Sequence, residues 1–445
     1  MLSDPIVALA TPPGRSAVAL LRLSGRGSFA IAERCLSPWH AELPRTVFRS
    51  RLSTPGGVAV DDVLAVSFSA PNSYTGEDLV EISTHGGLLA PAEALGALVA
   101  AGARPAEAGE FTRRAVLNGK MDLLQAEATA DLVDASAPAQ RRRALAQLDQ
   151  GLSKRLDALR SEVLELEGLT AYEIDFPEED DGPIPPERVV RAWEGVRGGV
   201  AELLGTAAEG ERLREGALLV IAGPPNAGKS TLFNALLGSE RAIVTEVPGT
   251  TRDAIEAPAV IAGFPFRLVD TAGLRQTDDR IEKMGIEVSR KYLGAADLVL
   301  YCDDREAGEW GRGEVGLSDS APVITVHTKG DLTSRLTTNR LTVSALTGAG
   351  MKELRQELAR VAFGKLIALG DVEPVVTRAR HRQALETALR ELDLFKEARS
   401  GGVEAIAAAT HLRAATGALD ALIGAVTPDD VLERVFSNFR WASDA

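Results

Sequence analysis

Residues 223–230 read Gly223-Pro224-Pro225-Asn226-Ala227-Gly228-Lys229-Ser230, and they follow the apolar run Ala217-Leu218-Leu219-Val220-Ile221. This order predicts a strand, a phosphate-binding loop and a helix. A backbone that wraps a polyphosphate needs glycine where a Cβ would clash, inward N–H groups, a lysine for the β and γ phosphates, and a hydroxyl for Mg²⁺. The two glycines, the lysine and the serine supply these groups. An ordinary glycine-rich turn is the alternative, and the sequence around the stretch decides against it.

A second motif follows at the spacing of a guanine-nucleotide domain. The segment Phe266-Arg267-Leu268-Val269-Asp270-Thr271-Ala272-Gly273 ends an apolar strand with an acidic residue and a glycine. Asp270 can contribute to the shell of Mg²⁺, and the amide of Gly273 can meet a γ-phosphate. The two motifs together predict binding of a nucleoside triphosphate.

Two later segments indicate which base is bound. The apolar strand expected at 323–327 ends in Thr328-Lys329-Gly330-Asp331. The carboxylate of Asp331 can accept hydrogen bonds from N1–H and the amino group of guanine, which adenine does not offer, so GTP is the expected ligand. The common form of this motif begins with Asn, and Thr328 is therefore expected to weaken one base contact. Ser344-Ala345-Leu346 fits the loop that closes over the base.

The composition is that of a globular protein with several domains. Hydrophobic residues make up 45% and charged residues 25% of the 445 positions, which is ordinary for soluble proteins. No apolar run approaches the ~20 residues that a membrane span needs, so we expect a cytoplasmic protein that does not enter a membrane. Cys35 and Cys302 are far apart, which predicts two buried, reduced thiols. The formal charge of −14 argues against a broad RNA-binding face built by this chain alone.

Changes in composition along the chain predict a multidomain protein. We expect an α+β domain at 1–118, a helical segment at 119–214, an inserted α/β GTPase domain of the Ras-like type at 215–364, and a second helical segment at 365–445. The two helical segments are expected to form one bundle, with two independent helical modules as the alternative. A buried stripe is predicted on helices between Arg141 and Leu169. Its residues are Leu145, Leu148, Leu152, Leu156 and Leu159.

Several short strings carry a resemblance that covers nearly the whole chain. They are Ala10-Thr11-Pro12-Pro13-Gly14-Arg15, Leu21-Arg22-Leu23-Ser24-Gly25, Pro71-Asn72-Ser73-Tyr74-Thr75-Gly76-Glu77-Asp78, His85-Gly86-Gly87, Gly109-Glu110-Phe111-Thr112 and Leu117-Asn118-Gly119-Lys120. With the nucleotide motifs, they resemble the MnmE (TrmE) family of tRNA-modification GTPases.

The resemblance implies both a reaction and a set of partners. The first domain would have a folate-binding fold, form a homodimer and bind a tetrahydrofolate derivative (5,10-methylene- or 5-formyl-tetrahydrofolate). The GTPase would work with an FAD-dependent MnmG (GidA) partner on tRNA. Together they would build a carboxymethylaminomethyl-type group on C5 of the wobble uridine, U34.

The same resemblance assigns three folate contacts to Arg22, Glu81 and Lys120. Arginine and lysine suit the glutamate tail of a folate, and a carboxylate can pair with the donor edge of the pterin ring. Taken singly, each residue could equally be part of a surface ion pair.

The resemblance further implies a potassium-dependent GTPase. Leu274 stands where many Ras-like proteins orient water with a glutamine. The family pattern makes Asn226, Lys229 and Glu282 catalytic, with Glu282 orienting water. It places K⁺ on Asn226 and the carbonyls of Thr245, Val247 and Thr250, and Mg²⁺ on Ser230 and Thr251. Without the resemblance, Asn226 is a turn residue and Glu282 a surface carboxylate. The expected GTP contacts are Asn226, Ala227, Gly228, Lys229, Ser230, Thr231, Thr245, Glu246, Val247, Pro248, Gly249, Thr250, Thr251, Asp270, Thr271, Ala272, Gly273, Thr328, Lys329, Asp331, Ser344, Ala345 and Leu346.

The C-terminal end departs from the family pattern. Arg440 occupies the position of the family's cysteine, and the chain ends at Ala445 without the terminal lysine. Because arginine cannot act as a thiolate near neutral pH, any role of that cysteine is not available here. Two other functions stay open. One is a GTP-dependent switch in ribosome assembly, which would also use an asparagine in the phosphate loop and a potassium loop. The other, because of the altered C-terminal end, is a folate- and GTP-binding regulator without modification chemistry.

Overall fold

The computed structural model describes residues 4–175, 185–238, 256–270, 291–304, 321–332, 341–371 and 373–424. The chain divides into two compact units. One contains the residues up to Ala130 together with those from Ile423 onward, and the other spans Asp131–Leu422. Within the described ranges, no helix combines the length and the apolar character that crossing a membrane requires.

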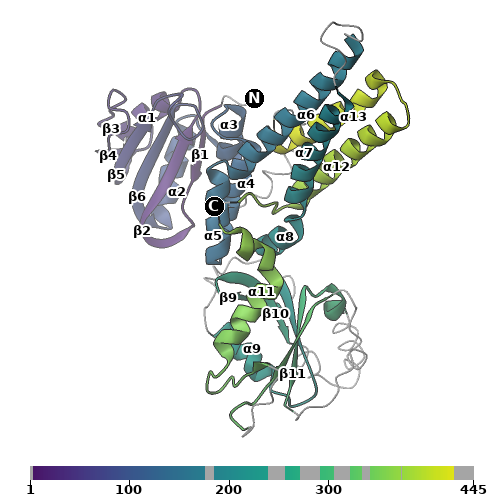
Figure 1. The fold of residues 1–445 in the computed structure, drawn as a ribbon. Coiled ribbons are helices and arrows are strands. Elements are labelled where there is room, and N and C mark those ends of the chain that lie inside the picture. Colours follow the sequence, from purple (N-terminus) through teal and green to yellow (C-terminus); the bar gives the residue numbers. More distant parts are fainter. Residues whose placement is uncertain are drawn as a thin grey trace. The chain divides into compact units, whose positions relative to one another are not determined.

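A seven-stranded sheet forms the N-terminal unit, in the order β3-β4-β5-β6-β2-β1-β7 (Figure 1). Neighbouring strands pair antiparallel, except that β1 and β7 run parallel. Its elements are β1 (Ile6–Leu9), β2 (Gly14–Ser24), α1 (Ser28–Cys35), β3 (Leu36–Ser37), β4 (Phe48–Ser53), β5 (Ala59–Phe68), β6 (Leu79–Gly87), α2 (Leu89–Ala100), β7 (Arg104–Pro105) and α3 (Glu110–Leu117); α4 (Leu123–Asp134) crosses the division between the units.

The core of this unit follows from the alternation of side chains along its strands. Leu21 and Leu23 of β2 are fully buried and pack with residues of α1 and α2, such as Ile31 and Leu98. Arg22, between the two leucines, points to the opposite face, and in the pairing register it lies opposite Glu81 of β6. The pleat therefore brings the first two predicted folate contacts side by side.

A six-stranded sheet forms the centre of the inserted domain, in the order β13-β12-β11-β8-β10-β9. It is parallel except for β9, which pairs antiparallel with β10. Every residue of β8 and β11 is buried, as expected of central parallel strands. Separate apolar clusters cover the two faces, and α9 and α11 contribute to one of them. The elements are β8 (Ala217–Ala222), α9 (Lys229–Leu237), β9 (Glu256–Ile261), β10 (Phe264–Asp270), β11 (Leu298–Asp303), β12 (Val323–His327), β13 (Leu341–Thr342) and α11 (Met351–Leu369).

Helices from before and after the inserted domain pack into one bundle (Figure 1). Arg197 of α7 pairs with Asp393 of α12 at 2.6 Å, and Trp193 Nε1 donates to the carbonyl of Leu392 at 2.7 Å. Arg413 of α13 pairs with Glu167 of α6 at 2.8 Å. The helices are α5 (Pro138–Leu148), α6 (Gly151–Asp175), α7 (Pro186–Leu204), α8 (Ala207–Glu215), α12 (Ala379–Ser400) and α13 (Ala405–Ile423).

The predicted fold class is confirmed: an α+β N-terminal domain, a helical bundle and an inserted α/β domain. The domain boundaries given above stay predictions. Both cysteines are free and buried, as predicted. Burial raises the pKa of the Cys302 thiol to about 12.

The predicted leucine stripe is wrong at its first position. α5 ends at Leu148 and α6 begins at Gly151, with Gln150 at φ 65° between them. Leu152, Leu156 and Leu159 are buried on α6 and Leu148 is half-buried at the end of α5, but Leu145 on α5 is 45% exposed. The reason is that the buried face of α5 is partly polar, since it carries Arg143. A pattern of apolar residues cannot reveal such a face.

Candidate functional site

The phosphate loop leaves the carboxyl end of β8 and is shaped by two glycines. Gly223 has φ 144°, and a Cβ there would lie 2.1 Å from the carbonyl oxygen of Cys302 on β11. Gly228 has φ 81° and stands directly before α9. Asn226 also has a positive φ, 62°, which asparagine tolerates better than most residues. The loop can therefore pass close to β11 and turn its backbone amides toward the start of α9, a favourable place for an anion.

The charged and hydroxyl groups of the loop belong to two adjacent residues at its end, where α9 begins. Lys229 is buried, and its Nζ donates to the carbonyl oxygens of Gly223 at 3.0 Å and Pro224 at 2.6 Å. Ser230 Oγ donates to Asp270 Oδ2 at 2.7 Å. The structure thus brings together a lysine, a hydroxyl and a carboxylate from α9 and β10. This donor set fits Mg²⁺ bound next to phosphates, because Mg²⁺ prefers oxygen ligands.

The base-recognition residues lie at the same edge of the sheet. Asp331 is exposed, and its Oδ1 accepts a hydrogen bond from Ser344 Oγ at 2.7 Å. Lys329 Nζ pairs with Asp304 at 2.6 Å. A cavity of about 270 Å³ opens between these segments and α9. It is lined by Gly228, Thr231, Leu232, Thr328, Lys329, Asp331, Leu332, Val343, Ala345 and Leu346.

Thr328 makes a contact that the sequence did not predict. Its hydroxyl donates to the carbonyl oxygen of Ala227 in the phosphate loop at 2.6 Å, and its own amide donates to the carbonyl of Asp303 at 2.7 Å. The side chain is 4% exposed. The motif that ends β12 is therefore bonded directly to the phosphate loop.

Part of the predicted site lies outside the described residues. This applies to the expected K⁺ ligands other than Asn226, to the expected Mg²⁺ ligand of the same loop, to the γ-phosphate contact and to the water-orienting glutamate. These residues are Thr245, Glu246, Val247, Pro248, Gly249, Thr250, Thr251, Thr271, Ala272, Gly273 and Glu282, and the departing C-terminal residues Arg440 and Ala445 lie there too.

In the N-terminal unit, the predicted folate contacts surround one loop. Arg22 donates through Nε and Nη2 to the same oxygen of Glu81, at 3.0 and 2.6 Å. Its guanidinium lies 5.0 Å from the ring centre of Tyr74 and 5.8 Å from that of Phe111. Lys120 Nζ donates to the carbonyl of Pro71 at 3.0 Å, and Pro71 begins the loop that carries Tyr74. Three charged side chains and two aromatic rings therefore lie in or next to the loop 71–76.

A buried ion cluster next to this loop was not predicted. Arg114 is 1% exposed and pairs with Glu110 at 2.9 Å and Glu77 at 3.1 Å, while Arg104 pairs with Glu110 at 2.7 Å. Burial alone would raise the pKa of Glu110, but hydrogen bonds from Arg104, the Glu107 amide and Arg114 outweigh it and lower the pKa to about 2. The cluster joins α3 to the loop that ends at Glu77.

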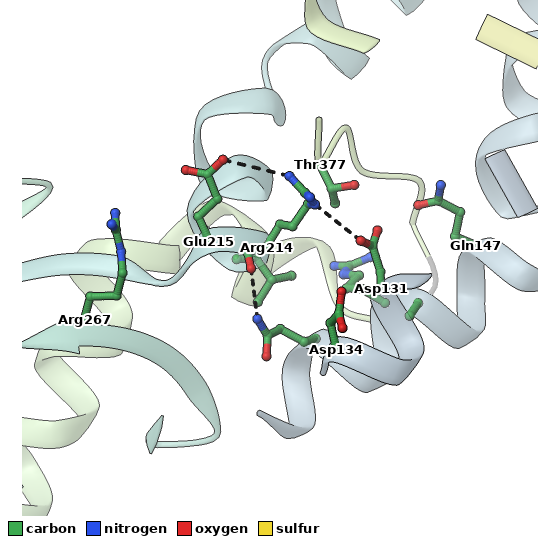
Figure 2. Close-up of a pocket in the computed structure, with 11 residues that line it drawn as sticks. Asp131, Asp134, Gln147, Arg214, Glu215, Arg267 and Thr377 are labelled. Carbon is green, nitrogen blue, oxygen red and sulfur yellow. Dashed lines mark hydrogen bonds and ion pairs between the residues drawn. The ribbon is translucent and has the colours of Figure 1, made fainter. Parts of the chain in front are cut away.

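A second cavity, of about 420 Å³, lies where the chain enters and leaves the inserted domain. Figure 2 shows Arg214 between Asp131 and Glu215. Asp131 Oδ1 accepts from Arg214 Nε at 3.3 Å and from Arg378 Nη2 at 2.6 Å. The chain enters the inserted domain through residues 213–216 and leaves it through residues 370–378, which we call the crossover segments. The carboxylate of Asp131 thus binds both of them.

Arg143 of α5 binds the second crossover segment through its backbone. It donates to the carbonyl oxygens of Gly370, Asp371 and Glu373. Burial lowers the pKa of its guanidinium. From the same helix, Gln140 Nε2 donates to the carbonyl of Arg214 at 3.1 Å. The signal in the sequence is a set of polar residues at helical spacing, Gln140, Arg143 and Gln147, of which the last two turn out to be buried.

Comparisons with known proteins match the chain along almost its full length. The family profile "GTP-binding protein TrmE N-terminus" matches residues 5–120, and the profile "MnmE helical domain" matches residues 123–439. The protein named "tRNA modification GTPase MnmE" from Aquifex aeolicus is 40% identical over 98% of this chain and 99% of its own length. Those of Salinibacter ruber and Thermus thermophilus are 41% and 40% identical, each over 98% of this chain and 98% and 99% of their own lengths.

Among solved structures, the G domain of the T. maritima FeoB iron transporter is 28% identical, covering 33% of this chain and 98% of that chain, with a TM-score of 0.23.

Proposed function

Because this chain belongs to the MnmE family of tRNA modification GTPases, we propose how its residues bind and cleave GTP and what the cleavage serves. The chain is a GTP hydrolase that acts in tRNA modification. The observation that supports the proposed site best is the meeting of Ser230 with Asp270 at the same sheet edge as the Asp331–Ser344 pair. A phosphate site and a base site therefore lie within reach of one nucleotide.

Different residues are proposed to bind the base, the phosphates and the metal ion. Asp331, held by Ser344, accepts hydrogen bonds from the N1–H and amino group of guanine. The amides of the loop 223–228 and the Lys229 ammonium bind the β and γ phosphates. Ser230 and Thr251, with Asp270 behind them, would hold Mg²⁺, which neutralises charge that develops on the phosphate oxygens. No described residue of this set needs to move a proton.

We propose that K⁺ and Glu282 complete the catalytic arrangement. Asn226 would hold K⁺ together with the carbonyls of Thr245, Val247 and Thr250. A cation there supplies positive charge close to the phosphates that react. Glu282 would orient the attacking water. The support is the sequence of these segments and the place of Asn226 in the phosphate loop.

The N-terminal unit is proposed to bind a tetrahydrofolate derivative and to form the homodimer. Tyr74 offers an aromatic face for a flat heterocycle, and Arg22, Glu81 and Lys120 offer charged partners for its polar groups. Exposed apolar side chains support a second copy as partner, because an interface would remove their apolar surface from water. They include Val18, Leu64, Leu88 and Leu89, which are 51–74% exposed.

The product of the reaction is proposed to be a carboxymethylaminomethyl-type group on C5 of the wobble uridine, U34. An FAD-dependent MnmG-type partner would share the tRNA, in keeping with the charge of −14 on this chain. The work on tRNA is proposed to take place in the cytoplasm.

Mass analysis of wobble uridines tests this function in cells that lack the gene. We expect the C5 substituent to disappear and to return when the gene is restored. Unchanged uridines would favour a ribosome-assembly switch or, given Arg440, a regulator without modification chemistry. Restoring the gene with Ser230→Ala should not restore the C5 substituent, because the proposal requires GTP cleavage for the modification.

A further inference from the structure

Thr328 has a single hydroxyl hydrogen, and the structure shows where it goes. The acceptor at 2.6 Å is the carbonyl oxygen of Ala227, which carries no hydrogen, so the hydroxyl must be the donor. Both partners are buried, at 4% and 0% exposure. A hydroxyl whose hydrogen is committed in this way can only accept any further hydrogen bond.

Guanine presents N7 and O6 as acceptors and its amino group as a donor. N7 can therefore be read only by a donor. Within the described lining of the base cavity, three side chains can donate: Thr231, Thr328 and Lys329. Lys329 Nζ carries three hydrogens, but its ammonium group is paired with the carboxylate of Asp304 at 2.6 Å. Thr231 lies in the first turn of α9, beside Ser230 on the phosphate side. Asp331 is an acceptor and is suited only to the donor edge of the base.

We propose that Thr328 donates its hydroxyl hydrogen to the phosphate loop and leaves N7 of guanine without a hydrogen bond. Base recognition in this chain then depends on the N1–H and amino group of guanine, which donate to the carboxylate of Asp331. An asparagine at this position would carry a carboxamide with two N–H hydrogens, enough for Ala227 and N7 together. The threonine keeps the link between base loop and phosphate loop but gives up the second contact. This inference rests on the proposed binding of GTP at this site.

The test uses 7-deaza-GTP, in which a C–H group replaces N7 while the donor edge is unchanged. We expect the unaltered full-length chain to bind GTP and 7-deaza-GTP with affinities within about twofold. Thr328→Asn should prefer GTP over 7-deaza-GTP by about three- to tenfold, the effect of one added hydrogen bond.

Two variants test the link to the phosphate loop. Thr328→Val keeps the shape but leaves the Ala227 carbonyl without its donor, and it should weaken both nucleotides equally, by about tenfold. Thr410→Val is the matched control, because Thr410 is an exposed residue of α13 whose hydroxyl also donates to a backbone carbonyl, that of Ala407 at 2.6 Å. It should bind both nucleotides as the unaltered chain does.

An unaltered chain that binds 7-deaza-GTP ten times more weakly than GTP would overturn the inference, because N7 would then be read. Equal binding of GTP by the Thr328→Val and unaltered forms would overturn the link. If the unaltered chain bound neither nucleotide, the proposed function itself would fail.

Discussion

Ser230 Oγ donates a hydrogen bond to Asp270 Oδ2 over 2.7 Å, which joins the first turn of α9 to the carboxyl end of β10. The two residues lie 40 positions apart in the sequence. The parallel pairing of β8 with β10 places their carboxyl ends together, and the contact follows from that pairing. It makes the serine hydroxyl and the carboxylate a ready pair for one metal ion.

Ser230→Ala should lower Mg²⁺-dependent GTP hydrolysis by at least about 100-fold, because several kcal/mol of charge stabilisation depend on the metal's position. Single-turnover hydrolysis at saturating GTP measures this. Ser161→Ala, at an exposed position of α6, is the matched control and should leave the rate unchanged. A normal rate in Ser230→Ala would remove the serine from the metal site.

Exchange of K⁺ for Na⁺ at equal ionic strength should slow hydrolysis by at least about tenfold, since the smaller ion fits the same ligands less well. Asn226→Ala should hydrolyse GTP slowly in both salts. Asn226 has φ 62°, so Asn226→Gly serves as the control for backbone strain. Recovery of K⁺ dependence in the glycine variant would show that strain, and not the lost amide, explains the alanine result.

Glu110→Gln should destabilise the N-terminal unit by about 3 kcal/mol at pH 7. The folded-state pKa of about 2 lies below the ordinary value of 4.5. The stabilisation is therefore complete above about pH 5 and is lost as the pH falls toward 2. The chain is unfolded in urea at each pH, and the exposure of the α3 amides is then measured by a pulse of hydrogen exchange at one fixed labelling pH. At pH 7 the urea midpoint obtained for α3 should be lower in the variant than in the unaltered chain. This difference should shrink between pH 5 and pH 2.

Glu93→Gln is the control for that experiment, because Glu93 is an exposed residue of α2. A difference for Glu110→Gln that stays constant from pH 7 to pH 2 would contradict a charged Glu110 in the folded chain.

Asp131→Ala should loosen both crossover segments, since its carboxylate accepts from Arg214 and Arg378. Removing a charged acceptor costs about 1.5–3 kcal/mol, so amides in 213–216 and 373–378 should exchange at least about tenfold faster. GTP affinity should change by less than about twofold. Asp157→Ala on the exposed face of α6 should alter neither. Faster exchange confined to one segment would show that Asp131 does not hold both.

The sequence predicted the parts of this molecule whose chemistry is local. Gly223 and Gly228 are required by a close approach to Cys302 and by a left-handed turn, and few residue types satisfy either need. Strands such as β8 and β11 were visible as short apolar runs with motifs directly after them. The Arg22–Glu81 pair was named through a resemblance, and its direct contact follows from the register of β2 and β6.

The remaining contacts depend on residues far apart in the chain. Thr328 and Ala227 are separated by 101 positions, so the sequence showed only that an asparagine was missing. Arg143 is buried because it binds carbonyl oxygens more than 220 positions later, which no helical periodicity reveals. The burial of Leu145 was predicted wrongly for the same reason, because Arg143 occupies the buried face of α5.

The central claim is that this chain selects guanine through Asp331 and cleaves the nucleotide at the phosphate loop. Equilibrium titration of the full-length chain and Asp331→Asn with GTP, ATP and XTP tests it most directly. Xanthine carries a carbonyl where guanine carries the amino group, and an amide can donate to it. We expect the unaltered chain to prefer GTP over ATP and XTP by at least about 100-fold, and Asp331→Asn to prefer XTP. Equal binding of ATP and GTP, or an unchanged preference in the variant, would contradict the account.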